Sequence, residues 1–454
     1  MASESHRKIG VFSHGGTKNL GDEALLAAVI QNVRLRIPGA NILGFTINPD
    51  DTRQRHGITS FPIRQWDESP SSSAVSNASH ASTASSAMLT PEAGWKRAIR
   101  SIPGLVPLFH WLQTIFRLMK SAVLEPKFLL DSCRRLRGVE LLLVAGSQQL
   151  NDGYGGPWGF PFTLYKWSRI ARLTGTKVAI LSVGAGPIDS PLSRFFFSRV
   201  LRMCSYRSYR DAISSRLVES MGVKGPNPVY PDLVYSLKLP APRPIPTEGH
   251  SLIVGANPVP FFDGRYWPEP DPARYADYVR KFADFAEWLD GNGYSVLFFP
   301  TQARADVLTI DDIRAALNGS GKSPRMLAGT HIQNIEDLIS EIARTDLVIA
   351  NRYHGILLSL ALNKPVLGVA YHEKSRALLE QVGQGDYVLN IADLRTEDLI
   401  EKFKALHANS AAIKKQIAAS MAPLREALEQ QYDLVFGLIG VAPSSSPKVN
   451  RPGP

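Results

Sequence analysis

The chain has 454 residues, of which 44% are hydrophobic and 20% charged, so we expect a soluble globular protein with two domains. Its two cysteines, Cys133 and Cys204, exclude a disulfide framework and favour a reducing compartment. The net charge of +10 favours anionic partners such as phosphorylated metabolites or a lipid surface, but the sequence shows no zinc-binding spacing and no basic low-complexity tail, so no nucleic-acid partner is expected.

Strand-length apolar runs alternate with helical patterns through the first half of the chain. A helix is expected at 22–36, where residues such as Ala24 and Val29 form an apolar stripe. The expected strands are 8–13, 42–47, 141–145, 177–183, 205–209 and 229–230. Strands that alternate with helices pair in parallel, so residues 1–238 are predicted to form a Rossmann-like domain.

Two stretches interrupt this first domain. Residues 68–93 are rich in Ser, Ala and Thr and cannot bury enough surface to offset their chain entropy, which predicts a disordered insertion. Residues 95–137 mix aromatic and aliphatic side chains with Arg and Lys. This pattern fits a basic amphipathic helix on an anionic lipid surface, and equally a helix that packs on the first sheet with its charges in water.

A proline-rich linker at 239–250 separates the first half from a second α/β series at 251–438. In this second series the expected strands are 252–256, 295–300, 346–350 and 366–370, and the expected helices are 273–289 and 411–436. Residues 439–454 are predicted to be a flexible tail. The start of the chain lacks a secretory pattern and no apolar run could span a bilayer, so we expect a cytoplasmic protein, with contact at the inner face of the membrane left open.

The most informative motif is Arg352-Tyr353-His354-Gly355, between a buried strand and a buried helix. Open parallel sheets bind ligands at the carboxyl ends of their strands, and the start of a helix offers free N–H groups to an anion. Arg352, His354 and the later Lys374 would form a cationic, proton-donating set at this place. The alternative is that these side chains only cap and pack the helix.

Three further strand ends carry polar clusters. The first includes Asn19, Gly21 and Asp22, where Asn19 and a basic Asp22 could meet an acceptor, although Asp22 also suits a helix start. It is neither a Walker A loop nor a dinucleotide fingerprint. The second begins at Gly146 and includes the amide of Gln148, which suits hydroxyl-rich ligands but also an ordinary polar loop. The third places Arg210 at a strand end.

Together and in order, these motifs resemble the polysaccharide pyruvyl transferase family. The resemblance covers roughly residues 8–385 without the Ser-rich insertion, and departs from the family at Gly146-Ser147-Gln148, where a run of glycines is usual. The matching positions are Asn19-x-Gly21-Asp22-Glu23, Gly146, Arg210-Asp211-x-x-Ser214, Pro231-Asp232, Arg352-x-His354-Gly355 and Pro365…Tyr371-x-x-Lys374.

The resemblance implies a GT-B-like fold, in which two Rossmann-like domains face a cleft, with the acceptor on the N-terminal side and the donor on the C-terminal side. It also implies transfer of the enolpyruvyl unit of phosphoenolpyruvate to a sugar of a surface polysaccharide or its lipid-linked precursor, with formation of a pyruvate ketal and release of phosphate. No metal and no cofactor beyond this donor substrate are expected.

Individual residues receive roles from the same resemblance. Arg352, Lys374 and Arg210 would bind the anionic donor, because phosphate and carboxylate call for several cationic contacts. His354 would protonate C3 of the donor, and Asp22 would act as a base for the acceptor hydroxyl. Acceptor contacts fall to Asn19, Gly21, Gly146 and Gln148.

Two other functions remain open from the sequence. One is a GT-B-type glycosyltransferase that uses a nucleotide sugar, since it would share the layout and a cationic site. The other is a non-catalytic protein that binds anions or lipid, against which the joint presence of Arg352, His354 and Lys374 argues.

Overall fold

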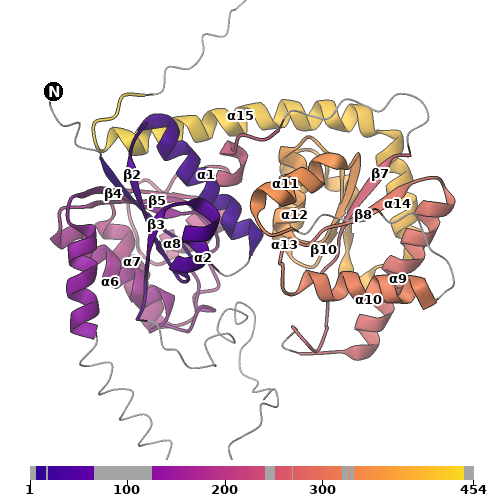
Figure 1. Ribbon diagram of the computed structural model, residues 1–454, viewed down its shortest axis with the longest axis horizontal. Coiled ribbons are helices and arrows are strands. Elements are labelled where there is room, and N and C mark those ends of the chain that lie inside the picture. The colour runs from indigo at the N-terminus through magenta and orange to yellow at the C-terminus, as the bar shows by residue number, and fades with distance from the viewer. Residues whose placement is uncertain are drawn as a thin grey trace, which may run out of the picture.

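The computed structural model describes residues 7–16, 19–65, 125–240, 251–267, 269–319, 327 and 332–443. Two α/β domains lie next to each other, the N-terminal one on the left of Figure 1 and the C-terminal one on the right. The predicted insertion at 68–93, most of segment 95–137 and nearly all of the linker lie outside the described residues.

The N-terminal domain is built on a parallel sheet of six strands in the order β3-β2-β1-β4-β5-β6. Its strands are β1 (Lys8–Phe12), β2 (Asn41–Thr46), β3 (Thr59–Pro62), β4 (Val139–Ala145), β5 (Lys177–Val183) and β6 (Tyr206–Tyr209). β1 and β4 are central and almost wholly apolar, as expected for strands covered on both faces. The strand predicted at 229–230 is wrong, because Val229 forms only an isolated bridge to Tyr209.

Helices cover both faces of this sheet. They are α1 (Leu20–Arg36), α2 (Pro49–His56), an unlabelled helix at 125–136, α6 (Phe160–Leu173), α7 (Pro191–Met203), α8 (Ala212–Ser220) and the short 3-10 helix η2 (Leu233–Ser236). In the unlabelled helix, Phe128 is buried and packs edge-on against Trp167 of α6. Residues 125–136 of the segment 95–137 therefore pack on the domain.

The C-terminal domain repeats the plan with a parallel sheet of five strands in the order β11-β10-β9-β7-β8. Its strands are β7 (Ile253–Asn257), β8 (Ser295–Phe298), β9 (Leu347–Ala350), β10 (Val366–Ala370) and β11 (Val388–Asn390). Its helices are α9 (Pro272–Gly291), α10 (Asp306–Gly319), α11 (Ile335–Arg344), α12 (Tyr353–Ala361), α13 (Glu373–Gln381), α14 (Thr396–Ala408) and α15 (Ser410–Gly437), with the 3-10 turns η3 (Gly385–Tyr387) and η4 (Ile391–Asp393).

The last helix, α15, spans both domains along the top of Figure 1. On the C-terminal domain Arg425 donates to the Ala361 carbonyl at 3.2 Å. On the N-terminal domain the Arg36 guanidinium pairs with Glu429 at 2.5 Å and Asp433 at 3.3 Å, and lies over the ring of Tyr432. The helix therefore binds the two domains together, as the length of the predicted helix suggested.

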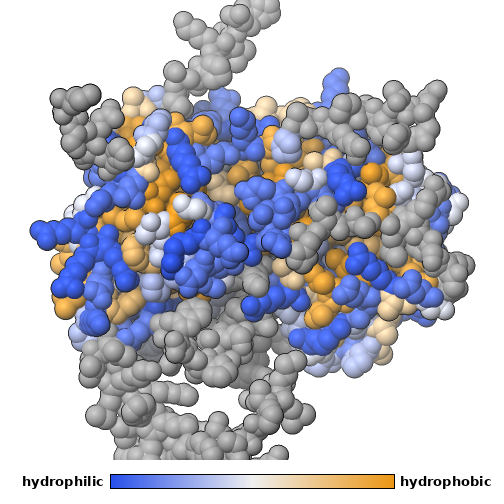
Figure 2. All heavy atoms as spheres, in the orientation of Figure 1, coloured by the Kyte–Doolittle hydropathy of each residue, from blue (hydrophilic) through white to orange (hydrophobic). Residues whose placement is uncertain are grey.

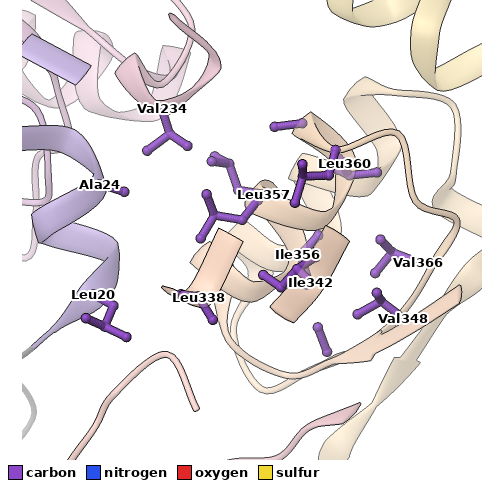
Figure 3. Packing of buried hydrophobic residues seen from close by; sticks show 14 of the residues in the cluster. Leu20, Ala24, Val234, Leu338, Ile342, Val348, Ile356, Leu357, Leu360 and Val366 are labelled. Atoms are coloured by element: carbon purple, nitrogen blue, oxygen red, sulfur yellow. The ribbon is translucent and has the colours of Figure 1, made fainter. Parts of the chain in front are cut away.

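The hydrophobic core continues from one domain into the other. Figure 3 shows Leu357 of α12 directed toward Ala24 of α1 and Val234 of η2, and all three belong to one buried cluster. A second cluster, which includes Trp167, fills the opposite face of the first sheet. On the face drawn in Figure 2, hydrophilic residues gather over the middle of the molecule, where the two domains meet. Within the described residues no helix is both long and apolar enough to cross a membrane.

Candidate active site

The carboxyl ends of the two sheets meet at the boundary between the domains. Here the Leu20 amide, at the start of α1, donates to the Thr301 carbonyl after β8 at 3.0 Å, and Asn19 forms an antiparallel bridge with Gln302. Crevices at the carboxyl ends of parallel strands are where open α/β folds bind ligands. Each predicted site residue lies on a loop or helix start at this boundary.

Arg352 is the N-cap residue of α12 and is held by a carboxylate that the sequence motifs did not indicate. Its Nε and Nη2 donate to Asp306 Oδ1 at 3.0 and 2.7 Å. The other oxygen, Asp306 Oδ2, accepts from the amides of Thr301 at 3.0 Å and Gln302 at 2.8 Å. Burial lowers the pKa of Arg352, but Asp306 and nearby tyrosines outweigh it and raise that pKa above its ordinary value. The Asp306 carboxylate thus ties α12 to the turn that touches the N-terminal domain.

His354 stands in the first turn of α12 and faces the other domain. A Cβ atom added to Gly21 would lie 2.1 Å from His354 Nδ1, so the absence of a side chain at position 21 lets the imidazole approach α1. His354 Nε2 is buried and has no hydrogen-bond partner among the described residues. Burial, then the charges of Arg210 and Arg352, lowers the pKa of His354 to about 3. Without a ligand the imidazole is therefore neutral, and its role as an acid requires a bound anion that raises this pKa.

Arg210 follows β6 and reaches the same place from the N-terminal domain. Its Nη2 donates to Gln148 Oε1 at 3.1 Å, and its guanidinium lies 5.0 Å from the centre of the Tyr353 ring. Asp211 and Asp232 lie at 3.6 and 3.8 Å, too far for good hydrogen bonds. Burial opposes the charge, but Tyr353 and the two carboxylates raise the pKa of Arg210. The guanidinium is thus charged, buried and incompletely bonded.

Lys374 lies in the first turn of α13, close enough to Arg210 and Asp211 to feel both charges. Partial burial, followed by the Arg210 charge, lowers the pKa of Lys374 to about 8. Its ammonium forms no ion pair within the described part of the chain. Arg210 and Lys374 therefore form a pair of cations, one from each domain, that a bound anion would stabilise.

Asp22 lies in the first turn of α1, directly after Gly21, the residue that His354 approaches. Its Oδ1 accepts from Ser147 Oγ at 2.7 Å and its Oδ2 accepts from Asn19 Nδ2 at 3.0 Å. Asn19 Oδ1 caps the helix by accepting from the Gly21 amide. Burial raises the pKa of Asp22 to about 6, against the opposing Ser147 hydrogen bond. A carboxylate with this pKa is suited to accept a proton near neutral pH.

Gly146 and Gln148 make internal contacts in the loop after β4. Gly146 has a φ of +39°, and a Cβ there would meet Leu25 Cδ2 at 2.9 Å, so this glycine lets the loop pack on α1. The Gln148 amide donates to the Gly186 carbonyl while its oxygen accepts from Arg210. Both residues shape the site, and their contact with an acceptor stays a prediction.

Aromatic side chains that the motifs did not indicate border the Asp22 side of the site. The His14 ring lies 4.1 Å from that of Tyr154 and 4.0 Å from that of Phe160. Burial, with the Asp22 charge second, raises the pKa of Tyr154, which places this phenol near Asp22. Nothing in the sequence linked His14, which follows β1, to the loop that carries Tyr154.

Asp306 is the main residue that the motifs missed. The other strand ends were identified by polar residues close after a strand, whereas Asp306 begins α10 and is separated from the end of β8 at Phe298 by residues 299–305. Within the described residues no group of three His, Cys, Asp or Glu side chains is placed to hold a metal ion.

Comparisons with known proteins agree with this layout. A family model described as polysaccharide pyruvyl transferase matches residues 19–373. The chain is 22% identical over 318 residues to the amylovoran biosynthesis protein AmsJ of Erwinia amylovora, which covers 65% of this chain and 72% of that protein.

Solved structures with little sequence identity share the fold. The UDP-GlcNAc 2-epimerase from Methanocaldococcus jannaschii superposes with a TM-score of 0.51 at 10% identity, over 87% of this chain and 92% of that one. A glycosyltransferase from Rickettsia africae ESF-5 gives 0.51 at 9% identity, over 96% and 99%. These likenesses confirm the predicted fold class, two parallel-sheet α/β domains arranged as in GT-B glycosyltransferases.

Proposed function

Because the chain belongs to the polysaccharide pyruvyl transferase family, as its motifs predicted, we propose that it transfers the enolpyruvyl unit of phosphoenolpyruvate to a sugar. The acceptor is a sugar of a surface polysaccharide or of its lipid-linked precursor, and the products are a cyclic pyruvate ketal and phosphate. Family membership makes the chain a transferase of exopolysaccharide biosynthesis. The donor and the ketal are the proposed part.

One observation carries the proposal: Arg210, Lys374 and His354 converge at the start of α12 with bonding capacity left over. Among the described residues, the Arg210 guanidinium donates one hydrogen bond, to Gln148, and His354 Nε2 has no hydrogen-bond partner. The free amides at a helix start add further donors. A small dianion with phosphate and carboxylate groups would satisfy all of these groups at once.

The same groups support the first bond-forming step. As a sugar hydroxyl adds to C2 of phosphoenolpyruvate, C3 must gain a proton, and His354 is placed to give it. Burial is the main cause of the low pKa of His354, and the charges of Arg210 and Arg352 add to it. The phosphate and carboxylate of the donor would offset these two charges and, next to the buried imidazole, would favour its protonated form.

The second step releases phosphate. The C2–O bond to phosphate breaks, the bonding electrons leave with phosphate, and a second hydroxyl of the same sugar adds to C2 to close the ketal. Arg210 and Lys374 would stabilise the departing charge. Asp22, with its pKa near 6, would accept a hydroxyl proton, and the other hydroxyl proton leaves with phosphate or restores the His354 acid.

The direct test is calorimetric binding of phosphoenolpyruvate to the full chain, with UDP- and GDP-sugars as competitors. We expect micromolar binding that Lys374→Met weakens at least tenfold, because a charge-assisted contact contributes about 1.5–3 kcal/mol. Lys415→Met, an exposed lysine of α15, is the matched control and should bind as the wild type does.

Two results would overturn the proposal. Tight binding of a nucleotide sugar that excludes phosphoenolpyruvate would make the protein a glycosyltransferase. Donor binding with no phosphate release in the presence of any lipid-linked or free saccharide from the organism's own envelope would leave only a non-catalytic anion-binding protein.

A further inference from the structure

A basic groove lies between α6 and α7, and none of its lining residues belongs to the candidate active site. Its volume is about 470 Å³, and four arginines line it, two from each helix. Tyr165 and Phe195 contribute apolar surface to the same groove. The arginines are Arg169 and Arg172 of α6 and Arg199 and Arg202 of α7.

The charge of these two helices is one-sided. Together they carry six Lys or Arg residues and not one Asp or Glu. Three of the six are engaged, since Lys166 pairs with Glu125, Arg194 donates to the Ile188 carbonyl and Arg202 donates to the Gly222 carbonyl. The four groove arginines form no ion pair within the described residues, so their charge stays available to an outside anion.

Large apolar side chains are exposed on the same surface. Trp158, just before α6, is 67% exposed, Leu173 at its end is 77% exposed, and Phe195 of α7 is 46% exposed. Arg199 lies over the Phe195 ring at 5.2 Å, so charge and apolar surface alternate closely. We call the surface formed by these three side chains and the four groove arginines the α6–α7 face.

The α6–α7 face points away from the rest of the protein. The apolar sides of α6 and α7 pack in the buried cluster that contains Trp167, whereas α1, on the other side of the sheet, packs in the cluster shared with the C-terminal domain. Figure 1 accordingly labels α6 and α7 on the side of the N-terminal domain distant from the C-terminal one. The domain interface therefore leaves this face uncovered.

We propose that the α6–α7 face docks the protein on a bilayer that carries anionic phospholipid. Guanidinium groups match phosphate oxygens in charge and geometry. Tryptophan, leucine and phenylalanine between basic residues form the surface type that enters the boundary between headgroups and acyl chains. A nucleic acid would use the arginines but would gain nothing from the exposed Leu173, so the lipid surface accounts for more of the face.

The loop after β4 carries Ser147 and Gln148 of the candidate site and leads on to Trp158 of the α6–α7 face. The docking itself goes beyond the proposed transfer and does not depend on which donor or acceptor is used.

The test is sedimentation of the full chain with two kinds of vesicle. One contains phosphatidylcholine alone, and the other contains phosphatidylcholine with about 30% phosphatidylglycerol, an anionic lipid. We expect binding to the anionic vesicles only, weakened at least tenfold by Arg169→Glu with Arg199→Glu. The matched control, Arg280→Glu with Arg314→Glu, changes the net charge equally on α9 and α10 and should bind as the wild type does. Leu173→Ser with Phe195→Ser should weaken the binding that persists in 0.5 M salt, where the Debye length falls to roughly 4 Å and charge attraction is strongly screened.

Three outcomes would overturn the inference. Equal losses in the two double-arginine variants would mean a general charge attraction with no docking face. Equal binding to neutral and anionic vesicles would show that the arginines do not contribute to membrane binding. The third outcome uses a single-stranded RNA of about 20 nucleotides, long enough to fill more than one small RNA-binding domain. If the protein bound this RNA and not the vesicles, the face would be assigned to nucleic acid. Phosphoenolpyruvate binding by each variant, measured alongside, separates this failure from a failure of the proposed transfer.

Discussion

The two arginines of the cleft have different surroundings. Arg352 gives two hydrogen bonds to the wholly buried Asp306, and its side chain is 19% exposed. Arg210 is only 6% exposed, yet it has one good hydrogen bond and two carboxylates at 3.6 Å or more. The comparison teaches that two cations of one candidate site can differ in the bonding capacity they have left. Arg352 is engaged by Asp306, whereas Arg210 has donors left over, so we expect Arg210 to contribute more to anion binding.

Removal of Asp306 should have the largest effect, because it leaves the Arg352 charge partly buried without its partner. We expect Asp306→Ala to lower the free energy of unfolding by about 3–5 kcal/mol. Asp311→Ala removes an exposed carboxylate from the same helix, α10, and should cost less than about 1 kcal/mol. Urea denaturation of both variants measures this, and equal losses would show that Asp306 is no more than a surface partner.

Substitution of each arginine by glutamine should separate the two roles. Arg210→Gln should weaken phosphoenolpyruvate binding by about 10–150-fold, the value of one charge-assisted contact of roughly 1.5–3 kcal/mol. Arg352→Gln should mainly lower stability, since it strands the buried Asp306 carboxylate. Calorimetry and denaturation on the same preparations test the contrast. The distinction fails if Arg352→Gln abolishes binding and leaves the unfolding free energy unchanged.

The smallest effect is a pH dependence that comes from Lys374. Its pKa is lowered to about 8, so the protonated ammonium, the form that binds an anion, is lost as pH rises through 8. Donor affinity should be about fourfold weaker at pH 8.5 than at pH 7, from the protonated fractions for that pKa. Lys374→Arg keeps the charge and should flatten the curve between these values. An unchanged slope in this variant would assign the titration to another group.

The sequence predicted the parts of the site that follow one another along the chain. The strand ends at Asn19, Gly146, Arg210 and Arg352 each combine an apolar run with polar residues, so local pattern sufficed to find them. Asp306 was missed because its partner lies 46 positions away, and only the folded domain brings the start of α10 beside the β9–α12 junction.

The fold class was also predicted, because alternating strands and helices restrict the topology to parallel sheets. Details that depend on tertiary contact were not. Gly21 was expected to serve an acceptor, yet its visible role is to let His354 approach across the domain boundary. The segment 229–230 has the apolar character of a strand, but only one bridge pairs it with the sheet.

Helix α15 has a mechanical consequence for catalysis. The chain passes between the domains twice, once near residue 240 and once within α15, so this helix restrains any movement of one domain against the other. Pro423 lies in α15 two residues before Arg425, which donates to the Ala361 carbonyl of the C-terminal domain. Proline has no N–H group and removes one backbone hydrogen bond from the helix, so α15 should bend more easily at Pro423 than elsewhere. Any opening of the boundary between the domains should therefore bend α15 at Pro423.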